Sequence, residues 1–597
     1  MKKICFLAFI MLMLRFGLDA QTVTFSHSGG YYENSFSLEL TCDETYHIRY
    51  TTNGTTPTSK SALYDSPLFL DSNLYSKSNI YTIVNCIPSR FRSVDDVDRC
   101  IIIRAAVFDK NERCVSNVES NSYFIKSLGC DFHGLPVFSI AADSLDLFGY
   151  ETGIFVPGKY YDENKSRNTG NYYQRGRDWE RVINLEFYEP DNSCINQQCG
   201  LRTHGNASRW FQQKGMKLYA RKEYSGKHFK HEFFNDTRST RFKHLTLHPF
   251  TCSVWVTTGG QEYISHQIVK GLNIDATSVR EVSVFINGEY WGIYTLEETP
   301  DERFLENRYG ADLTKANVVK YFEIQDHGDI SEWNELFEWF KTADLSLPAD
   351  SAFAYSHIDV PSFIDYMIFE IFSANLDWPE NNVKIWQPEK GQPFRFIFFD
   401  ADGCFIRWKH KALFHAMNSG RNSVVLNHFL QNKYFRKAFY DRYLELKTTR
   451  LSKETMTSAL KKYRKIVKDE IPRQAKRFSF PKNVKRWRRD LDTVSEFIAN
   501  RHAAFEEEFF STFQVNEKDI AYITNYPNPS KNTVTVYLKS MTANMVNISI
   551  YDSFGNKIKN EYHFVEEGMN IIKINVDLPS GIYNVKTNNL TQRIIIK

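Results

Sequence analysis

The stretch Asp377-Trp378-Pro379-Glu380-Asn381-Asn382 is followed, after a mostly apolar run at 394–399, by Asp400-Ala401-Asp402-Gly403. The apolar run predicts a short buried strand. Asp400 and Asp402, expected on the same extended strand, project their side chains to one face because side chains alternate along a strand, and this geometry favours coordination of one ion by both. Asp and Asn oxygens are the hard ligands that hold Mg²⁺ against nucleotide phosphates. The two segments therefore predict a magnesium site, and with it an enzyme rather than only a large surface protein.

Length and composition predict several ordered domains. A chain of 597 residues exceeds what one hydrophobic core usually supports, so we expect two to four domains. Aromatic residues make up 15% of the chain, and Gly and Pro are too sparse for a disordered or fibrous protein. The net charge of +3 gives no overall field that would attract nucleic acid. We therefore expect no nucleic-acid partner.

The amino terminus predicts export. Met1-Lys2-Lys3, an apolar run at 4–14 and then Asp19-Ala20 have the order of a secretory signal peptide over residues 1–20. No later segment reaches the roughly 18 uninterrupted apolar residues of a membrane-spanning helix, so we expect no transmembrane segment. Export permits disulfides, and Cys86 with Cys100 and Cys194 with Cys199 are plausible local pairs. No Cys/His spacing resembles a zinc site.

Residues 21–128 predict a small β-sandwich. Short alternating runs are separated by turn signals, of which Asn53-Gly54 is the strongest for a hairpin. Together with the segments at 28–32 (Ser-Gly-Gly-Tyr-Tyr) and 64–68 (Tyr-Asp-Ser-Pro-Leu), this region resembles the chitobiase and hexosaminidase C-terminal-type β-sandwich. The resemblance implies a fold and no catalytic residues. A role as a spacer is favoured over contact with glycans, and both stay open.

Residues 522–597 also predict β-structure. The segments at 526–529 (Tyr-Pro-Asn-Pro), 552–555 (Asp-Ser-Phe-Gly) and 580–583 (Ser-Gly-Ile-Tyr) occur in an order that resembles the type IX secretion C-terminal sorting domain. The resemblance implies the type IX secretion machinery as a partner and a secreted or outer-membrane surface location in a Gram-negative, Bacteroidota-like bacterium. Cell-surface lipopolysaccharide or glycans are further candidate partners. A generic immunoglobulin-like adhesion module is the alternative.

The central region, 135–513, predicts an α+β enzyme-like body with two further candidate groups. The turn from Arg202 to Arg209, with Ser208 in it, can present backbone N–H groups to an anion, while Lys214 or Lys217 meets phosphate charge. A hairpin around Asn287-Gly288 ends in Glu297, which could pair with such a lysine, and Lys320 follows on a predicted strand. A plain hairpin and surface ion pairs would explain the same charges.

Four motifs in one order suggest a family. The Gly-Asn-Ala-Ser-Arg turn with its lysines, the Asn-Gly-Glu-Tyr-Trp-Gly-Ile-Tyr-Thr-Leu-Glu hairpin, Asp377 with its Asn pair, and the Asp400-Ala401-Asp402 segment resemble the CotH kinase family, named for spore coat protein H. The resemblance implies an atypical protein-kinase-like fold that transfers phosphate from ATP to Ser or Thr of secreted or surface proteins, with Mg²⁺ or Mn²⁺. The resulting fold class is multidomain: an α+β atypical protein-kinase-like central domain flanked by two small all-β sandwich domains.

The resemblance also implies roles for individual residues. Lys214 or Lys217 would meet the phosphates, Glu297 would orient that lysine, and Asp377 would be the base or hydroxyl positioner. The expected metal ligands are Asn382 or Asn381 together with Asp400 and Asp402, and the expected further nucleotide contacts are Arg202, Ser208, Arg209 and Lys320.

Departures from conventional kinases leave a second function open. The chain has no Walker A sequence, no Gly-x-Gly-x-x-Gly and no His-Arg-Asp loop. Trp378-Pro379-Glu380 separates Asp377 from the Asn pair, and Cys404 lies just past the acidic pair. The alternative is a catalytically inactive CotH-like surface adhesion or structural protein. A glycosidase that uses Asp377 and Asp400 is a weaker third reading.

Overall fold

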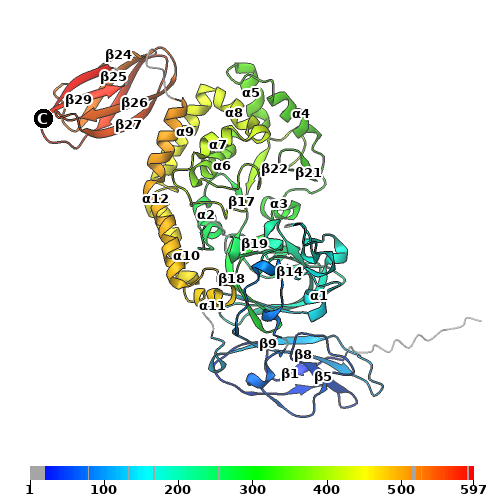
Figure 1. The fold of residues 1–597 in the computed structure, drawn as a ribbon. Helices are drawn as coiled ribbons and strands as arrows, with labels where there is room; N and C mark the ends of the chain where they lie inside the picture. Colours follow the sequence, from blue (N-terminus) through cyan, green and yellow to red (C-terminus); the bar gives the residue numbers. More distant parts are fainter. Residues whose placement is uncertain are drawn as a thin grey trace, which may run out of the picture. The chain divides into compact units, whose positions relative to one another are not determined.

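The computed structural model describes residues 21–77, 79–131, 134–165, 168–237, 239–252, 256–513, 520–525, 528–587 and 590–597. The expected signal peptide and residues 526 and 527 of the C-terminal motif lie outside these ranges. The chain forms two compact units, which we call unit 1 (the chain up to Lys227, with Val282–Ile293) and unit 2 (His228–Glu281 and Tyr294–Lys597). Figure 1 gives the labels of their helices and strands.

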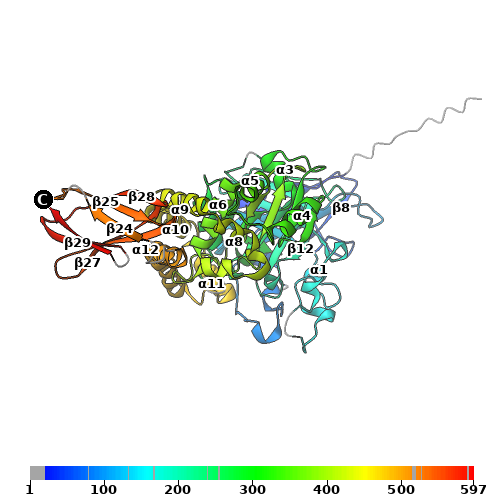
Figure 2. The same cartoon turned by 90° about the horizontal axis from the view of Figure 1, so that it is seen from above.

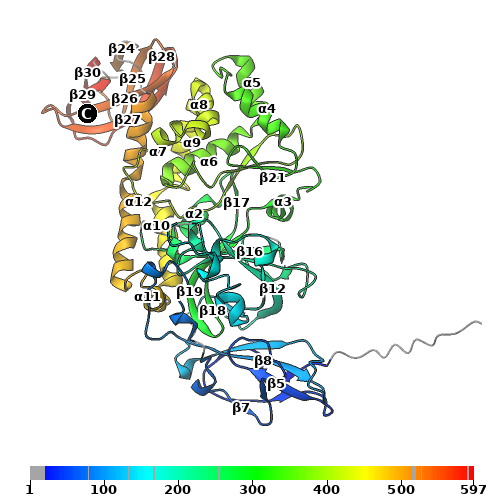
Figure 3. The ribbon, with the colours of Figure 1, turned by 45° about the vertical axis from the view of Figure 1, so that its right-hand side comes forward.

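Unit 1 begins with an all-β module, as expected. Its main sheet has the order β2-β9-β8-β5-β6, and the small pairs β1-β4 and β3-β7 accompany it (Figure 3). Ile48, Ile103 and Tyr123 are among the buried side chains of its core. The strands are β1 (Thr24–Phe25), β2 (Gly30–Tyr32), β3 (Ser37–Leu38), β4 (Leu40–Thr41), β5 (His47–Thr51), β6 (Ala62–Leu63), β7 (Leu68–Phe69), β8 (Ile101–Phe108) and β9 (Glu119–Ile125).

Four consecutive antiparallel strands follow in unit 1. Val137 of β10 pairs with Tyr188 of β11, Tyr188 pairs with Cys194 of β12, and β12 continues into pairing with β13. Strand β10 also runs parallel to β18. Leu185, Leu201 and Leu218 are fully buried, so this sheet carries its own apolar core. The elements are β10 (Val137–Ala141), α1 (Ser144–Phe148), β11 (Arg181–Tyr188), β12 (Cys194–His204) and β13 (Gly215–Tyr219).

The hairpin of β18 (Val279–Ile286) and β19 (Glu289–Glu298) holds the β module in place within unit 1. The fully buried carboxylate of Glu289 accepts hydrogen bonds from the backbone N–H groups of Ile80 and Tyr81, at 2.9 and 2.8 Å. Gly288 at the turn has φ +84°, and a Cβ there would lie 2.8 Å from the carbonyl oxygen of Cys100. The turn therefore needs glycine for its backbone and for the close approach of the module.

Unit 2 contains a five-stranded sheet with the order β17-β23-β22-β20-β21, surrounded by helices. The predicted strand at 394–399 is confirmed as β23 (Arg395–Phe398). Helix α6 (Val360–Ser373) contacts β23 and is buried along almost its whole length, as expected for a helix inside a core. The other strands of this sheet are β17 (Asp275–Ala276), β20 (Asn317–Lys320), β21 (Ile324–His327) and β22 (Lys384–Gln387). Unit 2 also contains β14 (Phe229–Lys230), β15 (Arg241–Phe242) and β16 (His244–Pro249), which lie outside this sheet.

The remaining helices of unit 2 complete the α+β body. Helices α10 and α12 contact each other and run side by side in Figures 1 and 3. Among the described residues, no helix is both long and apolar enough to cross a membrane. The helices are α2 (Gln261–Val269), α3 (Glu302–Tyr309), α4 (Ser331–Phe340), α5 (Pro348–His357), α7 (Ala412–Met417), α8 (Val424–Gln431), α9 (Lys433–Thr448), α10 (Lys453–Val467), α11 (Ile471–Phe478) and α12 (Val484–Phe513).

The C-terminal part of unit 2 is all-β, as expected. It has a three-stranded sheet, β24-β25-β28, and a four-stranded sheet, β27-β26-β29-β30 (Figure 2). One core takes buried side chains from both sheets, including Val536, Ile548 and Val585. The strands are β24 (Ile520–Asn525), β25 (Thr533–Ser540), β26 (Asn544–Tyr551), β27 (Lys557–Val565), β28 (Gly568–Asn575), β29 (Gly581–Thr587) and β30 (Leu590–Ile596).

The suggested disulfides are wrong. All nine cysteines after the signal peptide lie in the described ranges, and each is a thiol. Cys194 and Cys199 lie on one extended strand, β12. Five residues along a strand span about 17 Å, far beyond the roughly 7 Å limit for Cα atoms joined by a disulfide. Cys86 and Cys100 are both buried and do not bond to each other either.

One buried carboxyl in unit 1 predicts a pH effect on stability. Glu186 of β11 is 1% exposed, and burial raises its pKa from 4.5 to about 8. Between these values the folded protein holds a proton that the unfolded chain releases. The contribution of Glu186 to the free energy of unfolding should therefore fall as the pH rises from about 4.5 to about 8, by about 1–4 kcal/mol.

Urea unfolding at several pH values tests this expectation. Glu186→Gln keeps the size of the side chain and removes its charge, so the decline should be smaller in this variant by about 1–4 kcal/mol, while other buried carboxyls such as Glu281 and Glu370 keep their share of it. Glu33→Gln is the control, because the Glu33 side chain is 76% exposed. If Glu186→Gln and the unchanged protein show the same pH dependence, Glu186 is not the group responsible.

Candidate active site

Five carboxylates from four parts of unit 2 come close together, and we call them the acidic cluster. Asp377 follows α6, Asp400 and Asp402 follow β23, Glu297 lies on β19, and Glu262 lies on α2. Their charges influence one another's pKa: Asp377 and Asp400 both raise that of Asp402, and Glu262 raises those of Asp402 and Glu297. The segments quoted at the start of the sequence analysis thus meet at one place.

Asp377 and the two asparagines form a local hydrogen-bonded group. The side-chain amide of Asn381 donates to one carboxylate oxygen of Asp377 at 2.9 Å, and that of Asn382 donates to the other at 3.3 Å. Asn382 also donates to the backbone carbonyl of Asp400 at 3.4 Å. Burial raises the pKa of Asp377, and the bonds from both asparagines oppose that rise. The Asn pair therefore joins Asp377 to the acidic segment after β23.

The period-two argument for Asp400 and Asp402 is wrong. Strand β23 ends at Phe398, and Asp400 has φ +58°, in the left-handed region. The turn is held instead by Ala401, whose N–H donates to the buried carboxylate of Glu262. Gly403 is also required, because a Cβ there would lie 2.5 Å from Oδ1 of Asn375. A turn, rather than an extended strand, brings both carboxylates into the cluster.

The electrostatics of the cluster call for a cation. Burial, followed by the charge of Asp377, raises the pKa of Asp400 to about 7. Burial also raises the pKa of Glu262 to about 8 and those of Glu297 and Asp402 well above their usual values. Oε1 of Glu297 is buried without a hydrogen-bond partner among the described residues. Carboxylate and amide oxygens with excess negative charge fit a hard divalent cation.

Two lysines of unit 2 lie near this group. Lys320 of β20 is close enough for its charge to lower the pKa of Asp400. Lys384 of β22 pairs with Lys320 across the sheet, and its Nζ donates to Oδ2 of Asp326 at 2.7 Å and to the carbonyl of Pro300 at 2.5 Å. Lys384 was not singled out from the sequence, although it stands two residues after Asn382.

The other candidate residues belong to unit 1. Arg202 donates to the buried Glu180 at 2.9 and 2.6 Å, Ser208 to the carbonyl of His204, and Arg209 to that of Gly205. Lys217 lies over the ring of Tyr219. These residues take part in the turn and strands that carry them, and their contacts with nucleotide stay predictions.

Lys214 is the most deeply buried of these residues. Its Nζ donates to the carbonyls of Arg209 and Phe211, both at 2.9 Å, and lies 4.3 Å from the centre of the Tyr172 ring. Burial lowers its pKa from 10.5 to about 7. These contacts give the side chain a role inside unit 1, and its expected role toward phosphate stays a prediction.

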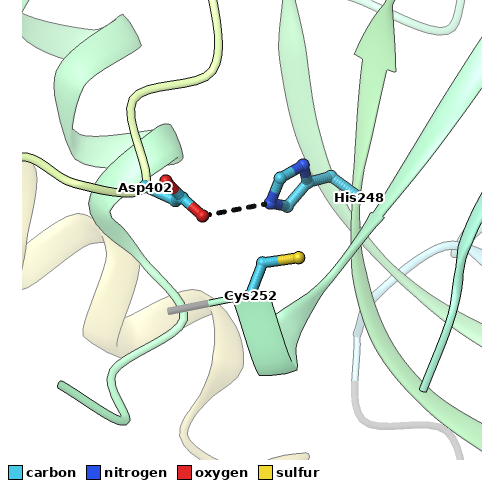
Figure 4. A group of neighbouring side chains, drawn as sticks. All are labelled: His248, Cys252 and Asp402. Atoms are coloured by element: carbon cyan, nitrogen blue, oxygen red, sulfur yellow. Dashed lines mark ion pairs between the residues drawn. The ribbon is translucent and has the colours of Figure 1, made fainter. Parts of the chain in front are cut away.

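Sequence reasoning missed His248 and Cys252. Nδ1 of His248 lies 3.6 Å from Oε1 of Glu297, and the expected pairing of Glu297 with a lysine stays a prediction. Nε2 of His248 lies 3.9 Å from Oδ2 of Asp402, and Cys252 faces both (Figure 4). The only signal in the sequence is the four-residue spacing of His248 and Cys252, because Asp402 is far along the chain.

Comparisons with known proteins give three matches along the chain. Residues 201–505, half of the chain, match the family model described as CotH kinase protein. Residues 27–81 match the chitobiase/beta-hexosaminidase C-terminal domain, and residues 524–597 match the secretion system C-terminal sorting domain. A solved structure, the proinflammatory kinase CtkA of Helicobacter pylori, shares 9% identity, covers 49% of this chain and 94% of its own, and has a TM-score of 0.22. No curated protein matches.

Proposed function

Because this chain belongs to the CotH kinase protein family, we propose that it is a secreted or cell-surface atypical protein kinase that transfers phosphate from ATP to Ser or Thr of extracellular or surface proteins. The C-terminal match to a secretion sorting domain supports delivery by the type IX machinery of a Bacteroidota-type cell. Anchoring at the outer membrane, and contact with lipopolysaccharide or glycans, belong to the proposal as its finer points.

The observation that carries the proposal is the meeting of Asp377, Asn382, Asp400 and Asp402 in unit 2. Phosphoryl transfer needs a metal-holding group, cationic charge near the phosphates and a residue that positions the attacking hydroxyl. Asp400, Asp402 and Asn382, or Asn381, would hold Mg²⁺ or Mn²⁺. When bound, that ion would neutralise the charge of the phosphates and of these carboxylates.

Asp377 would position the hydroxyl of the protein substrate and accept its proton. Its hydrogen bonds from Asn381 and Asn382 fix the carboxylate, and its raised pKa makes it a better proton acceptor than an exposed aspartate. Lys320, whose charge acts on Asp400, would contribute a cation on the phosphate side. Lys214, Lys217, Arg202, Ser208 and Arg209 remain proposed phosphate contacts.

One observation favours the alternative, an inactive surface adhesion or structural protein. Glu297 would orient a phosphate-binding lysine in an active enzyme, yet the basic side chain beside its carboxylate in the described part of the chain is His248, whose Nδ1 is 3.6 Å from Oε1 and whose pKa burial lowers to about 4. An inactive protein would bind cells or glycans independently of the acidic cluster. The two functions therefore differ in their requirement for metal and nucleotide.

Metal removal separates the two functions. Purified full chain is incubated with labelled ATP, Mn²⁺ or Mg²⁺ and an extract of surface proteins. We expect labelled protein that disappears when EDTA is added and returns with excess Mn²⁺. ATP with Mn²⁺ should also raise the melting temperature, because a ligand that binds only the folded state stabilises it. If the protein shows no phosphate transfer and ATP with Mn²⁺ does not change its melting temperature, the kinase proposal is contradicted.

A further inference from the structure

Three side chains of different chemistry face one another beside the acidic cluster. His248 is near the end of β16, Cys252 closes the short helical turn Phe250–Cys252 that follows, and Asp402 comes from the turn after β23. One ligand atom of each, a ring nitrogen, the sulfur and a carboxylate oxygen, lies within 4.8 Å of the others (Figure 4). The spacing approaches that of atoms that share one metal ion.

The three ligand atoms would have to move only a little to bind one metal ion. Zinc bonds of about 2.0–2.3 Å with tetrahedral angles place ligand atoms roughly 3.3–3.7 Å apart. Nε2 of His248 and Oδ2 of Asp402 are 3.9 Å apart already. Cys252 is 8% exposed, and the side chains of His248 and Asp402 are 18% and 16% exposed. The site is therefore largely enclosed, with some access from solvent.

The second nitrogen of His248 also fits metal binding. A metal-bound histidine usually donates its other ring N–H to a carboxylate, which fixes the ring and raises its basicity. Nδ1 of His248 lies 3.6 Å from Oε1 of Glu297, a buried oxygen without a hydrogen-bond partner among the described residues. Nε2, which faces Asp402, is buried and equally lacks such a partner in the described part of the chain. Nε2 thus faces a carboxylate that would bind the same metal ion, and Nδ1 faces a carboxylate that would accept a hydrogen bond from its N–H.

We propose that His248, Cys252 and Asp402 bind one transition-metal cation of the zinc class, with Glu297 as the carboxylate that orients His248. A thiolate and an imidazole select Zn²⁺ and its neighbours over Mg²⁺ and Ca²⁺, which take oxygen ligands. Three protein ligands leave a fourth tetrahedral position open, as in zinc sites that bind water or substrate. This site differs in its ligands from the proposed Mg²⁺ or Mn²⁺ ligands Asn382, Asp400 and Asp402, which we call the hard-metal group, and only Asp402 belongs to both.

Cobalt is the probe for the test, because a thiolate bound to Co²⁺ gives a charge-transfer band in the near ultraviolet. The full chain is stripped of metal with a chelator, kept reduced and titrated with Co²⁺ without nucleotide. We expect a band that saturates at one Co²⁺ per chain and is abolished by stoichiometric Zn²⁺. Absence of the band in the unchanged protein would overturn the proposal.

Matched variants assign the band to the three residues. Cys252→Ser should remove it, whereas Cys404→Ser should keep it, because Cys404 is a buried thiol that bonds to Ser373 in the same unit. His248→Gln should weaken zinc binding on the order of 100-fold, measured by competition with a coloured chelator. If Cys252→Ser does not fold, the affinity of His248→Gln decides, and unchanged affinity there refutes the site.

The outcome is independent of the proposed kinase activity. The cobalt band forms without ATP, and it reports a bound thiolate, a ligand that the hard-metal group does not contain. A protein without phosphoryl transfer can still show the band, and an active kinase can lack it. Circular dichroism of each variant shows whether a lost band reflects a lost ligand or a lost fold.

Discussion

Replacing Asp400 with Asn should lower the rate of phosphoryl transfer by about 100-fold or more, because it removes a carboxylate from the group proposed to hold the metal. Asp377→Asn should have an effect of similar size through the loss of the proton acceptor. Initial rates with labelled ATP, measured over a range of Mn²⁺ concentrations, provide the test. For Asp400→Asn the loss should be partly recovered at high Mn²⁺, whereas for Asp377→Asn it should persist.

The control for both variants is Asp312→Asn. Asp312 is an exposed aspartate of unit 2 whose carboxylate accepts hydrogen bonds from Thr314, at 3.0 Å from its N–H. This variant should keep the rate of the unchanged protein. Asp400→Asn should also melt at the same or a higher temperature, because it relieves repulsion from Asp377. Transfer at an unchanged rate in Asp400→Asn would contradict the assigned role.

Replacing Arg501 with Leu should lower the free energy of unfolding of unit 2 by about 3–5 kcal/mol. Arg501 of α12 is fully buried and donates to four backbone carbonyls: those of Ile371 and Phe372, at 2.7 Å each, and those of Trp408 and His410, at 2.9 Å each. Leucine would leave these acceptors without a donor in a dry environment. Unfolding in guanidinium chloride, followed by circular dichroism, measures the change.

Arg488→Leu is the matched control for this change. Arg488 lies on the same helix and is exposed, so its replacement should alter the free energy of unfolding by less than about 0.5 kcal/mol. Because Arg501 binds the last turn of α6, just ahead of Asp377, the Arg501 variant should also bind ATP with Mn²⁺ more weakly. Equal stability of the two variants would show that the four carbonyls find other donors.

The sequence was most informative where a pattern is local. The run at 394–399 predicted a strand, and the order of motifs predicted two β regions around an α+β body. The conformation of Asp400 was missed, because its left-handed backbone depends on Glu262, which binds Ala401 from a distant helix. Asp400 and Asp402 lie close together, as predicted, but the reason for that prediction, an extended strand through residues 400–402, was wrong.

Side-chain partners were harder to predict than elements. His248 entered the site because β16 pairs with β19 and the turn after β23 folds against them, which brings the His248 ring near Glu297 and Asp402, and no spacing in the sequence encodes that meeting. Lys214 was expected to meet the phosphates, and nothing in the sequence indicated that its Nζ donates to two carbonyls of its own turn. The contacts of His248 depend on tertiary structure and those of Lys214 on the conformation of its own turn, and periodicity reports neither.

The buried Glu289 sets a lower limit on how much of the chain must be produced for any of these experiments. A fragment that begins at residue 135 would remove Ile80 and Tyr81 and leave that carboxylate without its two N–H donors. A fragment cut to the kinase match would begin inside β12 and lack β10 and β11 altogether, leaving an open strand edge prone to aggregation. The match to the kinase family begins at residue 201, whereas the protein expressed for these experiments should begin at residue 21.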